Sequence, residues 1–260
     1  MLFFLSRQRM VFLGSILGLG VVLGIAGTWV RGGAARVMAQ TLQVLTTSPE
    51  DGAQDVPLYT EIRVRADVPL KRARFEVTPL TGKSLQGKVK VEGETAVFIP
   101  GEHFLPGTGY QVRLWLQARS GGERETGFWF ATRRVKGKWV AVKLGRVHTV
   151  TVYEDRMPVR LMLASGGKPG QETPRGTFTI QDRGQSFWSP RFREGALWWV
   201  RFHKEYLFHS VPRDEAGNIK EEEHAKLGLP ASHGCIRLSD PDARWLYENV
   251  PDGALVIIYH

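Results

Sequence analysis

The single cysteine is the residue in this chain whose neighbours most clearly point to chemistry. Cys235 lies in the run 232–238, which reads Ser-His-Gly-Cys-Ile-Arg-Leu. A thiol attacks a carbonyl only as its thiolate, and an adjacent histidine or exposed backbone N–H groups favour that form. Gly234 brings no side chain beside the cysteine, so backbone N–H groups there are able to face a developing oxyanion. These neighbours favour a reactive thiol over a buried apolar side chain, an intermolecular link or a lipid anchor.

One cysteine in 260 residues also excludes several classes of protein. It forms no disulfide within the chain and builds no cysteine-based zinc site. The seven histidines include no H-x-x-x-H pair, and the serines include no G-x-S-x-G motif. We therefore expect neither a metal ion nor another cofactor.

The cysteine lies in the second of two β-rich stretches. From Trp139 onward, short segments with period-two alternation are typical of half-buried strands. One helix is predicted directly after the cysteine motif, where Asp240 caps it, Pro241 suits its first turn and apolar residues recur at helical spacing as far as Val250. The predicted strands are 139–144, 149–153, 159–164, 176–180, 197–202, 206–209 and 254–259.

Residues 44–133 show the same alternation, interrupted by turn signals such as Thr81-Gly82. About seven strands in about 90 residues predict an antiparallel β-sandwich. The stretch resembles a bacterial Ig-like domain, because 48–53 reads Ser-Pro-Glu-Asp-Gly-Ala and 128–132 reads Phe-Trp-Phe-Ala-Thr. That resemblance implies a spacer or binding module. The basic stretch 133–138 is the predicted junction with the second unit.

The amino terminus predicts export. Residues 10–30 carry no charge, which is the length that crosses a hydrocarbon core of about 30 Å as a helix. Two arginines precede this segment and two follow it. We predict that 1–40 is a signal anchor, a transmembrane helix with a short cytoplasmic tip. A signal peptide cleaved after Val37-Met38-Ala39, followed by secretion, is the alternative.

The net charge of +9 is modest once the anchor is set aside. Four of these charges are arginines within residues 1–40, which leaves +5 on the exported part. This excess suits an anionic envelope polymer or membrane surface, or ordinary solubility. No RNA- or DNA-binding motif is present, so nucleic acid is not an expected partner. An apolar content of 42% excludes wholesale disorder.

The cysteine motif carries a second resemblance. The run 232–238, preceded by Leu-Gly-Leu-Pro at 227–230, resembles the signature of the L,D-transpeptidase catalytic (YkuD) domain. The likeness covers about residues 136–260 and includes three further segments: 166–170, 173–178 and 251–256. The fold class expected for the whole chain is therefore mainly β, with a transmembrane helix, an Ig-like sandwich and a mostly β catalytic domain with one main helix.

The resemblance implies a role for each residue that matches the family's motifs. Cys235 is the nucleophile, and His209, of the pair His209-Ser210, is the proton donor and acceptor. The carbonyl or hydroxyl group of Ser210 orients the His209 ring. The other expected roles fall on the motif itself: an oxyanion hole from the N–H groups of Gly234 and Cys235, site lining by His233 and Ser232, and a substrate carboxylate on Arg237.

The implied function is a peptidoglycan L,D-transpeptidase of the cell envelope, which joins stem peptides by 3→3 cross-links through a cysteine thioester. An L,D-carboxypeptidase on the same substrate and a non-catalytic wall-binding protein remain alternatives. The chain departs from the commonest family pattern in having 25 residues between His209 and Cys235. We predict that the extra residues 212–224 form a solvated loop, with a lid over the acceptor site as the alternative. His203 is predicted to be a core or rim residue and not the base.

Overall fold

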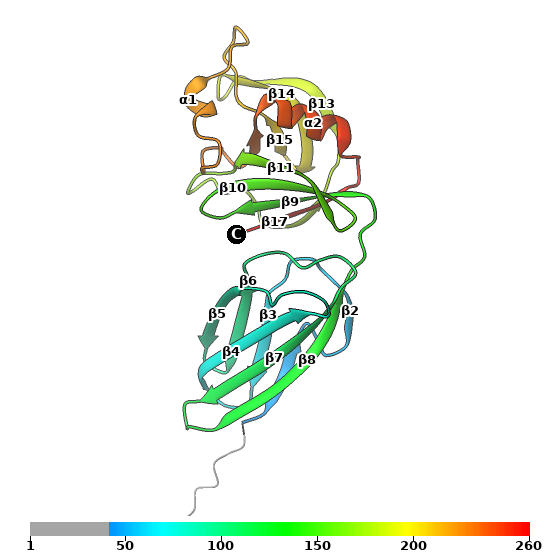
Figure 1. Cartoon of the computed structure of the whole chain (residues 1–260). Coiled ribbons are helices and arrows are strands. Elements are labelled where there is room, and N and C mark those ends of the chain that lie inside the picture. The colour runs from blue at the N-terminus through cyan, green and yellow to red at the C-terminus, as the bar shows by residue number, and fades with distance from the viewer. Residues whose placement is uncertain (1–41) are drawn as a thin grey trace, which may run out of the picture. The chain divides into compact units, whose positions relative to one another are not determined.

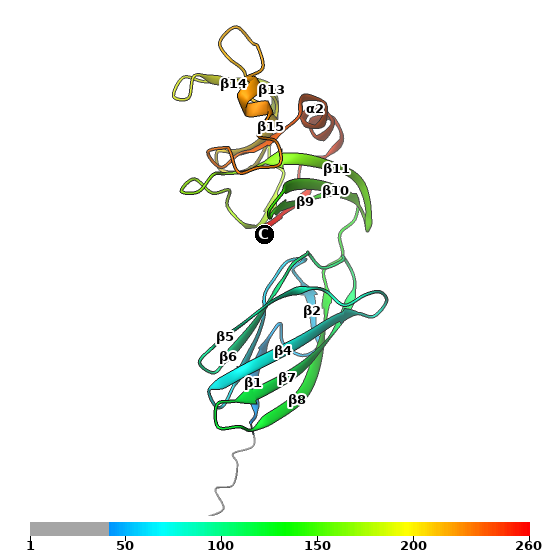
Figure 2. The same ribbon diagram turned by 60° about the vertical axis from the view of Figure 1, so that its left-hand side comes forward.

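Strands predominate in the computed structural model, which describes residues 42–260 (Figures 1 and 2). Strands β1–β8 form two four-stranded sheets, and strands β9–β17 form one nine-stranded sheet. The prediction of a mainly β protein is confirmed. The transmembrane helix predicted at 10–30 lies outside the described residues. Within residues 42–260, no helix is both long enough and apolar enough to cross a membrane.

The first two sheets account for residues 44–132. The predicted alternation of buried and exposed side chains is confirmed at residues 62–65. Ile62 and Val64 are buried, whereas Arg63 and Arg65 are exposed. The first sheet has the order β1 (Val44–Ser48), β3 (Ile62–Ala66), β6 (Thr95–Pro100), β5 (Gly87–Glu92). The second has the order β2 (Ala53–Val56), β8 (Glu123–Thr132), β7 (Gly109–Ala118), β4 (Leu70–Pro79).

The prediction of a purely antiparallel sandwich of about seven strands is wrong in one respect. There are eight strands, and β2 pairs with β8 in parallel. The chain turns between β1 and β2 and passes from one sheet to the other, so β2 joins the second sheet beside the last strand and runs in the same direction. Parallel neighbours require such a crossing and not a hairpin.

The nine-stranded sheet carries the cysteine. Its order is β12-β17-β9-β10-β11-β16-β15-β14-β13, and only β15 with β16 and β17 with β9 pair in parallel. The strands are β9 (Lys138–Leu144), β10 (His148–Glu154), β11 (Met157–Ser165), β12 (Gly176–Thr179), β13 (Arg183–Ser189), β14 (Glu194–His203), β15 (Tyr206–Ser210), β16 (Ile236–Leu238) and β17 (Leu255–Tyr259). Two helices accompany them: α1 (Glu221–His224) and α2 (Asp240–Asn249).

Two of these strands were not predicted. Strand β16 has only three residues, all buried, so it shows no alternation to read. Strand β13 alternates poorly because it lies at the edge of the sheet, where Gln185 and Ser186 are both exposed. Of the two unpredicted strands, β16 matters more, because it lies between β11 and β15. It sets the position of Cys235, which directly precedes it.

Helix α2 follows the cysteine strand and packs against β14 and β15 (Figure 2). Ala243 and Leu246 are its buried residues, as the helical spacing predicts. The predicted cap is wrong by one residue. Ser239 is the N-cap, because its hydroxyl accepts a hydrogen bond from the Asp242 N–H at 3.3 Å. Asp240 is instead the first helical residue and pairs with Arg213.

Candidate active site

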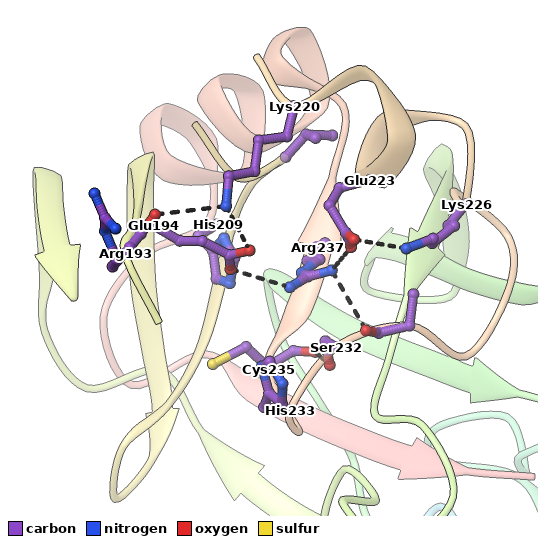
Figure 3. A network of polar contacts seen from close by, with 12 residues as sticks. Arg193, Glu194, His209, Lys220, Glu223, Lys226, Ser232, His233, Cys235 and Arg237 are labelled. Atoms are coloured by element: carbon purple, nitrogen blue, oxygen red, sulfur yellow. Dashed lines mark hydrogen bonds and ion pairs between the residues drawn. The ribbon is translucent and has the colours of Figure 1, made fainter. Parts of the chain in front are cut away.

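The predicted nucleophile and the predicted base line one cavity of about 500 Å³. The cavity lies between the β13–β14 hairpin, strand β15 and the loop that precedes β16, and Figure 3 shows the polar residues around it. Its lining includes five of the seven residues singled out by the motif: Cys235, His209, Ser232, His233 and Arg237. Its apolar walls come from four aromatic side chains that the sequence reasoning did not assign to the site: Phe187, Trp188, Phe192 and Tyr206.

The His209 ring is held in one tautomer. Its Nδ1 lies 2.6 Å from the carbonyl oxygen of Ser210. Because a carbonyl oxygen only accepts, Nδ1 must carry the proton, which leaves the lone pair on Nε2. Burial of the ring lowers the pKa of His209 to about 4, with a further contribution from the Arg237 charge, and the hydrogen bond to Ser210 opposes this only in part. His209 is therefore neutral at pH 7 and is able to accept a proton.

The carbonyl of Ser210, and not its hydroxyl, holds the ring. The Ser210 hydroxyl is engaged elsewhere: it accepts from the Leu197 N–H at 2.9 Å and donates to the Val211 carbonyl at 3.0 Å. Ser210 is fully buried, and the bond from Leu197 links β15 to β14. The contact that orients the His209 ring comes from a backbone carbonyl, so the type of side chain at position 210 does not reveal it.

The Cys235 thiol is half-buried and protonated at neutral pH. Its Sγ lies 3.8 Å from the carbonyl oxygen of Glu205, which is its hydrogen-bond partner in place of His209. Burial raises the pKa of the Cys235 thiol, whereas a backbone hydrogen bond from Leu207 and the charge of Arg237 act against the rise. The resting pair is thus a neutral thiol and a neutral imidazole in one cavity. Catalytic hydrogen bonds commonly tighten only when substrate is bound.

The loop before β16 has a different internal structure from the one predicted. The Ser232 hydroxyl accepts from the Gly234 N–H at 3.0 Å and donates to the Cys235 carbonyl. The Gly234 N–H is therefore already bonded and does not face an oxyanion, which corrects that expectation. Ser232 is fully buried, and its hydroxyl group stabilises the loop through these two hydrogen bonds. Of the two predicted oxyanion donors, the Cys235 N–H is the remaining candidate.

Gly234 is required for another reason. Its φ is +116°, a conformation that residues with a side chain rarely adopt. A Cβ at this position would also lie 2.4 Å from Cε1 of Tyr206. The glycine thus permits the Tyr206 ring to pack directly against the loop that carries the nucleophile.

Arg237 does not offer its guanidinium to a substrate. The side chain is 4% exposed, its Nη1 pairs with Glu223, and its Nη2 lies 3.5 Å from Glu194 (Figure 3). The prediction that Arg237 binds a substrate carboxylate needs a free edge, and both terminal nitrogens are occupied by carboxylates of this chain. The alternation of β16 is too short to have revealed that Arg237 faces inward.

The remaining histidines near the cavity take two different places. His233 is exposed at the rim, where its ring stacks on Phe192 with centroids 4.4 Å apart. The part of the His233 ring that is shielded from water lowers the pKa of His233, and the charges of Lys168 and Arg237 lower it further. His203 packs between Phe178 and Tyr206 and is not among the residues that line the cavity. This arrangement supports the choice of His209 over His203 as the base.

The segment 212–224 is not simply a solvated loop. Three of its charged residues are more than three-quarters buried, and each pairs with an oppositely charged residue of the sheet or of α2. The pairs are Arg213 with Asp240, Lys220 with Glu194 and Glu223 with Arg237. The turn at 214–218 and the residues of α1 on either side of Glu223 are mostly exposed. A run of charges in sequence did not distinguish solvated side chains from paired ones.

Among residues 42–260, no three His, Cys, Asp or Glu side chains gather in a way that suits a metal ion.

The nine-stranded mixed sheet carries a free cysteine directly before its short strand β16, and a buried histidine lines the same cavity. Comparison with known protein families assigns the chain to a class. Residues 137–258 match the L,D-transpeptidase catalytic domain family (YkuD), and residues 39–121 match the bacterial Ig-like domain family (Big_5). Over 145 residues the chain is 38% identical to "Putative L,D-transpeptidase YciB" of Bacillus subtilis (strain 168), which covers 54% of this chain and 71% of that protein.

The chain belongs to the L,D-transpeptidase family and carries an Ig-like domain on its amino-terminal side. Two solved structures are also similar. An L,D-transpeptidase from Mycobacterium smegmatis is 22% identical, with a TM-score of 0.37 over 84% of this chain and 98% of that one. An L,D-transpeptidase from Stackebrandtia nassauensis is 26% identical, with a TM-score of 0.40 over 48% of this chain and 56% of that one. Scores this low indicate a loose superposition, so the family assignment rests on the sequence matches.

Gly234→Ala is expected to destabilise the catalytic region by about 2 kcal/mol or more, because it combines a positive φ with a clash against Tyr206. The matched control is Gly253→Ala, which has φ +77° but no atom within 4 Å of the added methyl group. We expect it to cost only about 1 kcal/mol. Urea unfolding of both variants measures the difference, and equal losses would contradict the close approach of Tyr206.

The depressed pKa of His209 predicts a pH-dependent stability. Above pH 6.5 the ring is neutral in both states; as the pH falls from 6.5 to about 4, only the unfolded chain takes up the proton, so the folded state loses stability. The contribution reaches about 3 kcal/mol at the lower pH. Urea unfolding at pH 7 and pH 4.5 should show a smaller loss in His209→Gln than in the unsubstituted protein. Equal losses would mean that the ring is not buried as a neutral group.

Proposed function

We propose that this protein is a peptidoglycan L,D-transpeptidase that forms 3→3 cross-links through a thioester on Cys235. One observation carries the proposal: the buried His209, fixed as the Nδ1–H tautomer by the Ser210 carbonyl, shares a cavity with the only thiol of the chain. A neutral imidazole with its Nε2 lone pair free is the form a general base needs. Membership of the L,D-transpeptidase family supports the substrate class.

In the acylation step, a tetrapeptide stem enters the cavity with the carbonyl of its third residue near Sγ. His209 Nε2 takes the thiol proton as sulfur attacks that carbonyl carbon. The raised pKa of the Cys235 thiol disfavours a free thiolate, so the proton leaves Sγ while the new C–S bond forms. The Cys235 N–H is the proposed donor to the oxyanion. His209 then gives its proton to the nitrogen of the leaving terminal D-alanine, and a thioester remains.

In the transfer step, an amine of a neighbouring stem attacks the thioester carbonyl. His209 accepts a proton from that amine, an amide bond forms, and the C–S bond breaks. The sulfur leaves as thiolate and recovers its proton from His209, which restores both neutral groups. The aromatic walls of the cavity, with Phe192 stacked on His233 at the rim, favour an amine over bulk water by limiting access.

The remaining chain is assigned to placement in the envelope. We propose that residues 1–40 anchor the protein in the cytoplasmic membrane, that the Ig-like domain at 44–133 acts as a spacer, and that the catalytic domain at 136–260 works outside the cytoplasm. Release by cleavage after Ala39 is the alternative form of the same arrangement. The partners are then stem peptides and the membrane.

Product analysis tests this function. With a purified disaccharide-tetrapeptide as substrate, we expect cross-linked dimers together with released D-alanine, and none of either from Cys235→Ala. Mass spectrometry separates the products. Tripeptide monomers without dimers would establish the carboxypeptidase alternative, and no D-alanine release by the unsubstituted protein would contradict both enzyme activities.

A further inference from the structure

Behind the cavity, the structure contains a compact cluster of buried charges that the cysteine mechanism does not use. Arg237 is its centre, bonded through one terminal nitrogen to Glu223 and to the Ala231 carbonyl, and through the other to Glu194 (Figure 3). The side chains of Glu223 and Glu194 are only 15% and 20% exposed. Buried charges of this kind are costly unless they are paired, so the cluster needs an explanation.

The geometry of the sheet brings this cluster to the reacting groups. Strands β15 and β16 pair in parallel, and the register sets His209 opposite Arg237. Cys235 lies two residues before Arg237, directly before the start of the same strand. The guanidinium therefore lies near both the base and the nucleophile. In agreement with this, its charge contributes to the lowered pKa of His209 and opposes the rise that burial causes in the pKa of Cys235.

The carboxylate of Glu223 comes from outside the sheet. It lies on α1, within the segment that lengthens the spacing between His209 and Cys235. Although burial acts to raise the pKa of Glu223, its bonds to Lys226 and Arg237 lower it overall, so it is ionised at neutral pH. Both carboxylates also pair with a lysine, but Glu194 is the poorer partner for Arg237 because it lies 3.5 Å from Nη2, whereas Glu223 contacts Nη1 more closely. Glu223 is thus the principal counter-charge of the guanidinium.

We propose that Glu223 is a positioning residue for the reaction: through Arg237, it offsets the positive charge that acts on His209 and Cys235. This inference rests on the proposed function, which supplies the reaction that Glu223 affects. Without Glu223, Arg237 stays in place through Glu194 and the Ala231 carbonyl, but its charge is less balanced. The charged and titratable groups that face Arg237 are Glu194 from β14, His209 from β15, Cys235 and His233 from the preceding loop, and Lys220, Glu223 and Lys226 from the 212–226 segment.

A balanced guanidinium has a clear consequence for catalysis. An uncompensated positive charge would make the thiolate more stable, but it would also make His209 a weaker base and the sulfur a weaker nucleophile. Glu223 keeps the thiol protonated until His209 removes the proton during attack. The extra segment between His209 and Cys235 then adjusts the electrostatics of the site and does not need to touch the substrate.

The test is the pH dependence of thiol alkylation. Because Cys235 is the only cysteine, the rate of reaction with iodoacetamide in the whole protein reports on that thiol alone. In Glu223→Gln we expect the apparent thiol pKa to fall by about 0.5–1 unit. Glu221→Gln is the matched control, since Glu221 is on the same helix but its side chain is 83% exposed, and it should leave the pKa unchanged. No fall in Glu223→Gln, or an equal fall in the control, would overturn the proposal.

A second variant distinguishes the electrostatic effect of Glu223→Gln from a folding defect. Lys226→Gln removes the competing cation from Glu223 at a half-exposed position, so the carboxylate balances Arg237 more fully and the thiol pKa should rise by about 0.2–0.3 unit. General loosening of α1 would shift both variants in one direction, which would contradict the proposal. Alkylation does not require a peptidoglycan substrate. Its result is therefore independent of the product analysis that tests the proposed function.

Discussion

The site depends on a strand of three residues. Strand β16 fills the gap between β11 and β15, and its parallel pairing with β15 fixes the cysteine loop next to His209. Parallel strands cannot be joined by a tight turn, so a long connection between them is required. That connection contains α1 and the paired charges of the 212–226 segment. The same constraint thus produces the wall of the cavity and the inward-facing Arg237. It also brings the proposed base to the same cavity as the proposed nucleophile 26 positions later in the chain.

Burial determines how the two reacting groups behave. The same low-polarity surroundings keep the imidazole unprotonated and the thiol protonated, so neither carries a charge before substrate arrives. In the proposed reaction, proton transfer from Cys235 to His209 creates charge only when the carbonyl carbon of a substrate is in place for attack by the sulfur. A neutral resting thiol also resists oxidation better than a thiolate does, which suits a lone cysteine outside the cytoplasm.

Local signals predicted much of this structure, and distant contacts account for what they missed. Alternation identified most strands and helical spacing identified α2, because both patterns report on one face of one element. The motif singled out Cys235 and the resemblance singled out His209, and the structure places both residues in the lining of one cavity. The bonds between Ser232, Gly234 and Cys235 lie within one loop and depend on its backbone conformation, which the motif alone did not reveal. The bonds that Arg237 makes to Glu223 and Glu194 were not predictable, since both partners come from other parts of the chain. The clash between a Cβ at 234 and Tyr206 is of the same kind: it joins residues 28 positions apart.

The central claim is that His209 activates Cys235 for acylation, and intact-mass measurement of the acyl-enzyme tests it most directly. With a carbapenem as the acylating probe, the proposed function predicts one adduct per chain in the unsubstituted protein and none in Cys235→Ser. The rate of adduct formation should fall by at least about 100-fold in His209→Ala, in line with the loss of a general base, and far less in His203→Ala. Equal rates in the two histidine variants, or an adduct that survives in Cys235→Ser, would contradict the account.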